Sequence, residues 1–94
     1  MIVFITGKLT KKTPDHIIID LNGLGYFCYI SANTYDDLPS EGEMLSLLTY
    51  FNVTEHKHEL YAFSEKLERE LFMMLIGVSG IGPKTAIGLL AAVS

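Results

Sequence analysis

The stretch 61–86, YAFSEKLERELFMMLIGVSGIGPKTA, contains a change of hydrophobic period that divides this sequence into two parts. After Ser64, Leu67, Leu71 and Leu75 recur every fourth residue, which predicts an amphipathic helix with these leucines on its buried side. We expect Ser64 to cap the helix at its N-terminus. The same buried side is widened by Phe72, Met74 and Ile76.

Two glycines and a proline interrupt this helical pattern at VSGIGPKTA, residues 78–86. Pro83 suits the first position of a second helix, and Gly80 and Gly82 let another molecule approach the backbone closely. Successive N–H groups at such a turn can bind an anion, and Lys84 adds positive charge. The pattern favours a phosphate-binding loop of Gly80, Ile81, Gly82 and Lys84, with Ile81 anchoring the turn. The alternative is a tight corner between helices with Lys84 in solvent.

Two other phosphate motifs do not fit this stretch. GVSGIG begins like a Walker A loop, but Pro83 stands at the lysine position and a helical pattern precedes it. The dinucleotide motif requires a third glycine where Thr85 stands, and a strand before it.

The second helical run begins at Pro83 and ends on small and apolar residues. Its residues at helical spacing are Ala86, Leu89, Leu90 and Val93. An apolar end of this kind needs a surface to pack against. We therefore expect residues 64–94 to be the start of a larger helical domain, and the chain to be a fragment of a longer protein.

The first 63 residues have strand patterns instead. Five apolar runs rich in β-branched and aromatic residues occur there: MIVFITGKL, HIIID, YFCYI, EMLSLLTYFNV and ELYAF. Three strands, a connector and two strands fit a small barrel, and the OB-fold is the common five-stranded barrel. The predicted fold class is α+β, mainly β, with an OB-fold domain over residues 1–63 and helices over 64–94.

Turn signals separate these runs. Lys11–Pro14 is predicted to be a turn, and Asn22-Gly23 is a strong hairpin dipeptide. Gly25 favours a connection of about three to five residues, or a bulge, over a minimal turn. Thr34–Leu38 has the pattern of a single helical turn.

The composition excludes several classes of protein. A net charge of −4 argues against a surface that neutralises phosphates throughout, so nucleic-acid contacts are expected to be local. No apolar stretch approaches the roughly 20 residues that span a bilayer, and the N-terminus has no signal-peptide pattern. Cys28 has no partner for an internal disulfide and is expected to be buried in a strand, which fits a cytoplasmic location.

Several motifs resemble one known family in their order and spacing: MI…TGKL, LNGLGY, DLPSEGE, TYFNVTEH, LYAF and ERELFMMLIGVSGIGPKTA. Together they resemble the N-terminal part of the RuvA family, whose members bind Holliday junctions, over nearly all 94 residues. The resemblance implies an OB-fold followed by a helical domain with two helix-hairpin-helix motifs. Only the first motif is present here, and the second hairpin and the C-terminal domain are absent.

In this family, four subunits form a square that holds a four-way junction open, and hairpin loops grip its arms by their phosphates. The resemblance implies phosphate contacts by Gly80, Ile81, Gly82 and Lys84. It also implies a non-catalytic subunit that acts in DNA recombination and repair. The implied partners are the DNA junction, the RuvB motor (through the absent C-terminal domain) and the RuvC nuclease, with a homotetramer for the full-length protein. No cofactor is implied.

The family also has two adjacent acids, the acidic pin, in the hairpin between the last two barrel strands. The matching residues are Glu55 and His56, and His56 departs from the acidic pair. Because histidine is mostly neutral at pH 7, the repulsion of phosphates at the tip is expected to be roughly halved. The basic residue that often precedes the pin is replaced by Thr54, and Glu59 cannot be assigned to compensate.

Other interpretations of the chain are weaker. His56 and His58 could share one strand face, but no third metal ligand accompanies them. Seven aromatic residues could form a surface that stacks bases: Tyr26, Phe27, Tyr29, Tyr50, Phe51, Tyr61 and Phe63. Because no basic residues are interleaved with them, a place in the barrel core or in a subunit interface fits them better. No catalytic arrangement is apparent. The rival functions are a protein-interaction module and the DNA-binding appendage of a nuclease or ligase.

Overall fold

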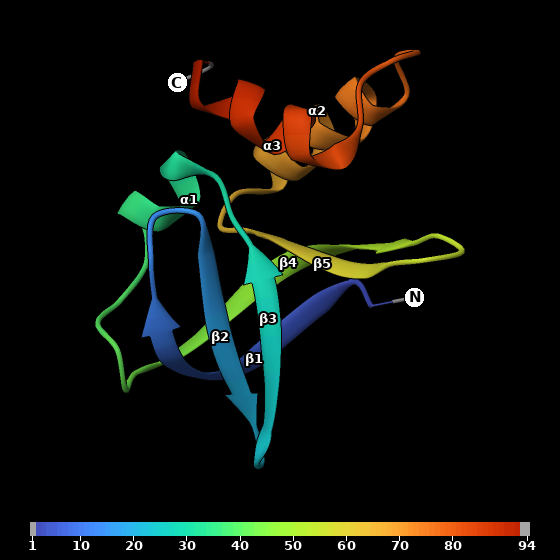
Figure 1. Cartoon of the computed structure of the whole chain (residues 1–94). Helices are drawn as coiled ribbons and strands as arrows, with labels where there is room; N and C mark the ends of the chain where they lie inside the picture. Colours follow the sequence, from blue (N-terminus) through green and yellow to red (C-terminus); the bar gives the residue numbers. More distant parts are fainter. Residues whose placement is uncertain (1, 93–94) are drawn as a thin grey trace.

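The computed structural model describes residues 2–92, which form a closed five-stranded barrel with helices packed across one end (Figure 1). The strands are β1 (Phe4–Lys12), β2 (His16–Leu21), β3 (Leu24–Tyr29), β4 (Met44–Val53) and β5 (His58–Phe63). The helices are α1 (Ala32–Asp36), α2 (Lys66–Ile76) and α3 (Pro83–Leu89), and a 3-10 turn follows at Leu90–Ala92. The predicted fold class, an OB-type barrel followed by a helical segment, is confirmed. None of the helices within residues 2–92 has the length and apolar composition needed to cross a bilayer.

The barrel closes in the strand order β1-β2-β3-β5-β4, with β4 returning to pair with β1. All neighbouring pairs are antiparallel except β3 and β5, which run parallel and place Cys28 opposite Leu60. A bulge between Leu9 and Lys11 shifts the register of β1 against β2. Such irregularities let a strand bend around a small barrel.

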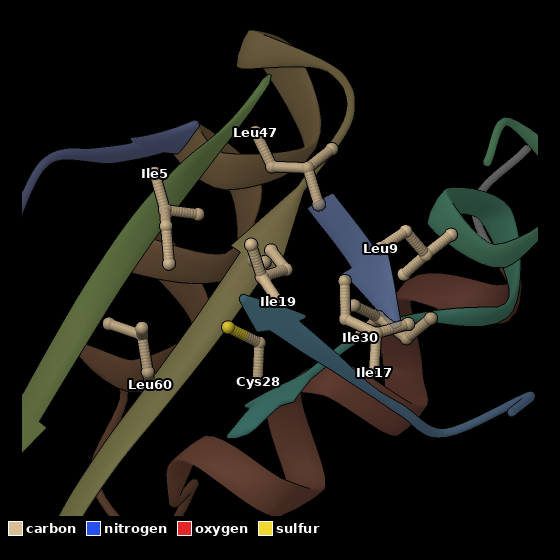
Figure 2. Close-up of a cluster of buried hydrophobic side chains, with 9 residues drawn as sticks. Ile5, Leu9, Ile17, Ile19, Cys28, Ile30, Leu47 and Leu60 are labelled. Carbon is tan, nitrogen blue, oxygen red and sulfur yellow. The ribbon is translucent and has the colours of Figure 1, made fainter. Parts of the chain in front are cut away.

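The barrel interior is filled mainly by aliphatic side chains, and β3 contributes Cys28 (Figure 2). Its buried residues are Ile5, Leu9, Ile17, Ile19, Cys28, Ile30, Leu47, Leu60 and Ala62. Ile5 and Leu9 on β1, and Ile17 and Ile19 on β2, are buried while their neighbours are more exposed, as the two-residue period of a strand requires. Cys28 is fully buried and unpaired, as predicted, and burial raises the pKa of its thiol to about 12.

Two of the predicted connections are wrong. Leu21 pairs with Leu24, so Asn22-Gly23 is a minimal two-residue turn, with φ of 52° and 95° as in a type I′ turn. Gly25 is not part of that connection, because it lies within β3 opposite Asp20. The predicted turn at Lys11–Pro14 is also shorter than expected, since Lys11 and Lys12 belong to β1.

The connector helix α1 begins two residues before the predicted turn at Thr34–Leu38. Ser31 is its N-cap, and its Oγ accepts a hydrogen bond of 3.1 Å from the Thr34 amide. A serine at this position satisfies one of the amides that a helix start leaves unpaired. The cap therefore determines where the helix starts.

The predicted cap of α2 is also wrong. Glu65 occupies the N-cap position and makes no side-chain cap hydrogen bond. The Ser64 hydroxyl instead donates to Asp37 Oδ2 at 2.7 Å, and the Ser64 amide donates to Thr34 Oγ1 at 3.1 Å. Ser64 therefore joins the end of β5 to the α1 region.

The predicted buried side of α2 is only partly correct. Leu67 is 69% exposed and Met74 is 71% exposed, whereas Phe72 and Glu68 are buried. Leu71, Leu75 and Ile76 are partly buried against a second core of Tyr61, Phe63, Phe72, Ala86 and Leu90. In the second helical run, Ala86 and Leu90 are buried as predicted but Leu89 is exposed; Val93 lies outside the described residues.

Polar contacts join the helices to the barrel and set their position. The buried Glu68 accepts hydrogen bonds of 2.8 Å from both Ser31 Oγ and Thr34 Oγ1. Arg69 Nε donates to the carbonyl of Thr49 on β4 at 2.7 Å. Asn33 Nδ2 donates to Leu90 O at 3.0 Å. These contacts, with the second aromatic core, orient α2 and α3 on the barrel.

Candidate nucleic-acid interface

The loop between α2 and α3 is shaped by its glycines. Gly77 follows the last turn of α2, and its amide donates to Met74 O at 3.2 Å. Gly80 has φ of +87°, a left-handed conformation that a side chain disfavours. Gly82, the N-cap of α3, has φ of −87° and ψ of 171°, which any L-residue can adopt. A Cβ at Gly82 would have no other atom within 4 Å. Neither the backbone nor the packing of the described chain therefore requires glycine at residue 82.

Backbone amides in this loop remain available to an outside acceptor. The Ile81 amide donates to Val78 O at 3.1 Å, which closes the turn, and the Ile81 side chain packs against the second core as predicted. Within residues 2–92, the amides of Gly80, Gly82 and Lys84 donate to no other group. Such amides at a helix start are potential donors to an anion.

Lys84 lies in the first turn of α3, but its side chain contacts the barrel. Its Nζ lies 3.6 Å from Glu59 Oε2 on β5 and 4.4 Å from the ring centroid of Tyr29 on β3. Interaction with Tyr29 first, and then with Glu59, raises the pKa of the Lys84 ammonium. The Lys84 side chain is 57% exposed, so it makes these contacts while remaining largely in solvent. Phosphate binding by Lys84 remains a prediction.

Glu59 is a residue of this region to which the sequence assigned no role. Its Oε1 accepts hydrogen bonds from Tyr61 Oη at 3.1 Å and Asn52 Nδ2 at 3.4 Å, and its side chain is only 13% exposed. Burial alone would raise the pKa of Glu59, but these hydrogen bonds and the charges of Lys84 and Lys57 lower it below the ordinary value. Asn52 pairs with Glu59 across β4 and β5, and a local sequence pattern does not reveal this register.

The predicted pin residues lie at the tip of the β4–β5 hairpin, which extends to the right of the barrel in Figure 1. Thr54 closes the tip: its amide donates to Lys57 O at 2.8 Å, and its Oγ1 accepts from the Lys57 amide at 3.1 Å. Glu55, His56 and Lys57 are all exposed. Lys57 adds a positive charge two residues from Glu55, so the formal charges of this tip cancel when His56 is neutral.

The loop before α3 and the β4–β5 hairpin both extend toward the right of the view in Figure 1. The Lys84–Glu59 contact joins the two regions, since Glu59 lies on the hairpin just below its tip. The structure thus brings Lys84 close to the hairpin that bears Glu55 and His56. Sequence separation gave no indication of this proximity.

The aromatic residues divide between core and surface. Tyr61 and Phe63 are fully buried, and Phe72 packs against both with ring centroids about 5 Å apart. Phe27 is 46% exposed and stacks on His16 with a centroid distance of 4.6 Å. Within residues 2–92, no three histidine, cysteine or acidic side chains are grouped in a way that could hold a metal ion.

Comparison with known proteins gives matches over the whole chain. Residues 1–62 match the model of the RuvA N terminal domain. A relative from Geobacter sp. (strain M21), named Holliday junction branch migration complex subunit RuvA, is 50% identical over 91 residues, covering 97% of this chain and 46% of the relative. A relative of the same name from Neisseria meningitidis serogroup C / serotype 2a is 46% identical over 94 residues, covering 100% of this chain and 48% of the relative. The chain thus spans about half the length of these curated relatives.

Proposed function

The chain belongs to the RuvA family through its N-terminal domain, and from this membership we propose that it is a DNA-binding part of a protein that recognises four-way junctions. In this proposal, the loop of Gly80, Ile81, Gly82 and Lys84 holds backbone phosphates of the junction arms. The β4–β5 tip with Glu55 and His56 lies at the crossover, where negative charge repels the strands.

The proposal also assigns DNA binding and motor activity to different subunits of a larger complex. This chain binds and shapes DNA without catalysis, and an ATP-driven motor, RuvB, moves the junction. The full-length protein assembles as a homotetramer, hands junctions to the RuvC nuclease, and acts in the cytoplasm in recombination and repair. The names of the relatives, which describe a subunit of a branch migration complex, support this proposal.

The observation that most supports phosphate binding is the set of amides at Gly80, Gly82 and Lys84 that are unpaired within residues 2–92, beside the open space at Gly82. The backbone conformation of Gly82 suits any residue, and no other atom of the described chain would meet a Cβ there. The absence of a side chain at this position leaves the loop backbone open to close approach by another molecule. The unpaired amides of Gly80, Gly82 and Lys84 supply donors that suit phosphate oxygens.

The net charge of −4 is compatible with this proposal. Sequence-independent binding of a shaped DNA needs phosphate contacts at defined places rather than a basic surface throughout. Backbone amides add no formal charge, so an acidic protein can present them.

The proposal is tested by Gly82→Val, with Gly88→Ala in α3 as the matched control. Valine can adopt the backbone conformation of Gly82, so the fold is expected to persist while the added side chain blocks close approach of a phosphate. Loss of charge-assisted hydrogen bonds is expected to weaken junction binding about tenfold or more, since each contributes about 1.5–3 kcal/mol. Gly88→Ala, which has open space for its methyl group, should bind as the wild type does.

Binding is measured by gel shift on a four-way junction and on linear duplex with the same arm sequence. Each variant is tested as the 94-residue chain and also extended with the remaining half of the Geobacter relative. Full junction affinity in Gly82→Val would contradict the proposed loop. Equal, weak binding of wild type to both DNAs would favour the protein-interaction module. Lys84→Glu should also lose junction preference, but it places a second carboxylate beside Glu59 and is therefore the less specific probe.

A further inference from the structure

Lys84 and Glu59 form an ion pair in which other hydrogen bonds hold the carboxylate and the lysine side chain is the more exposed member. Glu59 is held by Tyr61 and Asn52 through one oxygen, and its other oxygen faces Lys84. The Lys84 side chain is 57% exposed, compared with 13% for Glu59. The carboxylate is therefore a fixed anion, and the long lysine side chain is the member that can move.

The position of this pair relates it to the candidate loop. Lys84 is two residues after Gly82, and its ammonium lies over the Tyr29 ring while it faces Glu59. A carboxylate and a phosphate oxygen are both anionic acceptors for an ammonium group. The Glu59 carboxylate thus pairs with the Lys84 ammonium group, as a DNA phosphate would.

We infer that Glu59 competes with DNA phosphate for Lys84 and so lowers the DNA affinity of each loop that meets a phosphate. This inference rests on the proposed function. The exchange is local to each loop, so Lys84 stays on Glu59 wherever a phosphate contact gains less than the ion pair provides. This holds whether one loop or several loops meet DNA.

The competition has a thermodynamic signature in the salt dependence of binding. A lysine that is neutralised within the protein releases no DNA counterion unless it first leaves its carboxylate. Each new lysine–phosphate contact makes the slope of log K against log salt concentration steeper by about 0.9. Freeing Lys84 should therefore make the slope steeper by the amount expected for one added lysine–phosphate contact. An effect of overall charge alone should be the same whether or not Lys84 is present.

The test compares wild type, Glu59→Gln, Lys84→Gln and the double variant on linear duplex and on a four-way junction. Glutamine keeps an oxygen that can accept from Tyr61 and Asn52, so the hairpin is expected to keep its fold. Glu70→Gln removes one charge from an exposed position of α2 and is the control for net charge. Thermal unfolding of each variant checks that the fold persists.

Glu59→Gln is expected to bind duplex more tightly than Glu70→Gln does, and its gain on the junction, summed over the loops, should be at least as large. Its salt slope on duplex should be steeper by about 0.9, a further loss of about 3.5-fold in affinity from about 50 to about 200 mM salt. These differences should vanish in the double variant, because Lys84 is no longer present. A fold defect from loss of Glu59 would persist in the double variant, which separates the two causes.

Equal duplex affinity and salt slope in Glu59→Gln and Glu70→Gln would overturn the inference. If wild type then still prefers the junction and Gly82→Val abolishes that preference, the proposed function stands and only the role of Glu59 fails. If wild type shows no junction preference at all, the proposed function fails and the inference with it.

Discussion

Ser31 Oγ donates a hydrogen bond of 2.8 Å to Glu68 Oε1, and Ser31 Oγ also accepts a hydrogen bond from the Thr34 amide in the first turn of α1. One hydroxyl can do both, since it has one hydrogen to donate and two lone pairs. Ser31 therefore contributes both to the start of α1 and to the placement of α2 above it. The candidate phosphate loop follows α2 directly, so its position over the barrel depends on this contact as well.

Glu68→Ala is expected to destabilise the fold by about 2–3 kcal/mol, because buried hydroxyl donors of Ser31 and Thr34 lose their acceptor. Urea unfolding followed by circular dichroism measures the change. Glu70→Ala, at an exposed position of the same helix, should change stability by less than about 0.5 kcal/mol. Similar effects of the two substitutions would contradict the role assigned to Glu68.

Glu59→Gln is expected to alter how stability depends on pH. Because the pKa of Glu59 is lowered in the folded chain, its charge stabilises the fold above the unfolded-state pKa, and this contribution is lost as pH falls through the folded-state pKa. Wild type should be more stable than the variant at pH 7, by less than about 1 kcal/mol since Lys84 is largely exposed. The difference should disappear on acidification from about pH 5 to about pH 3. A constant difference across that window would contradict this account.

Gly7→Ala is expected to cost about 1–3 kcal/mol through overpacking of the barrel. A Cβ at Gly7 would lie 2.7 Å from both Asp20 O and Ile19 Cγ2, and the carbonyl cannot move without shifting β2. Gly25→Ala is the control, since the contact there, with Ile18 Cγ2, is an ordinary 3.5 Å. Thermal unfolding of both variants gives the comparison, and equal midpoints would show that the barrel adjusts freely at Gly7.

The orientation of α2 can be tested by substituting one residue on each side of the helix. Phe72→Ala should cost about 3–5 kcal/mol because its ring is fully buried between Tyr61 and Phe63. Leu67→Ala should change stability by less than about 0.5 kcal/mol, because this leucine is 69% exposed. The leucine pattern of the sequence predicts a large cost at both positions, so chemical denaturation distinguishes the two orientations.

His56→Asp should strengthen repulsion of DNA strands at the junction centre, if the β4–β5 tip lies there as proposed. The substitution restores two adjacent acids and gives the tip a net negative charge despite Lys57. Fluorescence of 2-aminopurine placed at the crossover should rise as this base unstacks in the complex. His58→Asp adds the same charge beyond the tip and is the control. Equal fluorescence with both variants, or an unchanged branch-migration rate, would argue against the proposed pin.

Some of these features could be predicted from sequence because their causes are local. The runs rich in β-branched and aromatic residues in β1 and β2 predicted strands, and Pro83 predicted the start of α3. The glycine loop was likewise located by a short-range pattern, whereas the hairpin with Glu55 and His56 was placed by the family resemblance. The prediction at Ser64 failed because a contact with a distant residue, Asp37, decided the outcome. The prediction at Gly25 failed for a local reason, since Asn22-Gly23 alone connects Leu21 to Leu24.

By itself, the sequence determined the succession of strands along the chain, the break between α2 and α3, and the residues available to the candidate loop, since propensity, turn chemistry and hydrophobic period act over a few residues. Only the tertiary structure decided that Glu68 is buried while Leu67 is exposed, and that Lys84 meets Glu59. The physical reason is that α2 has apolar residues around much of its circumference, so its period does not select one buried side. Polar contacts with α1 and the aromatic core select it, and the same docking brings Lys84 over the β4–β5 hairpin.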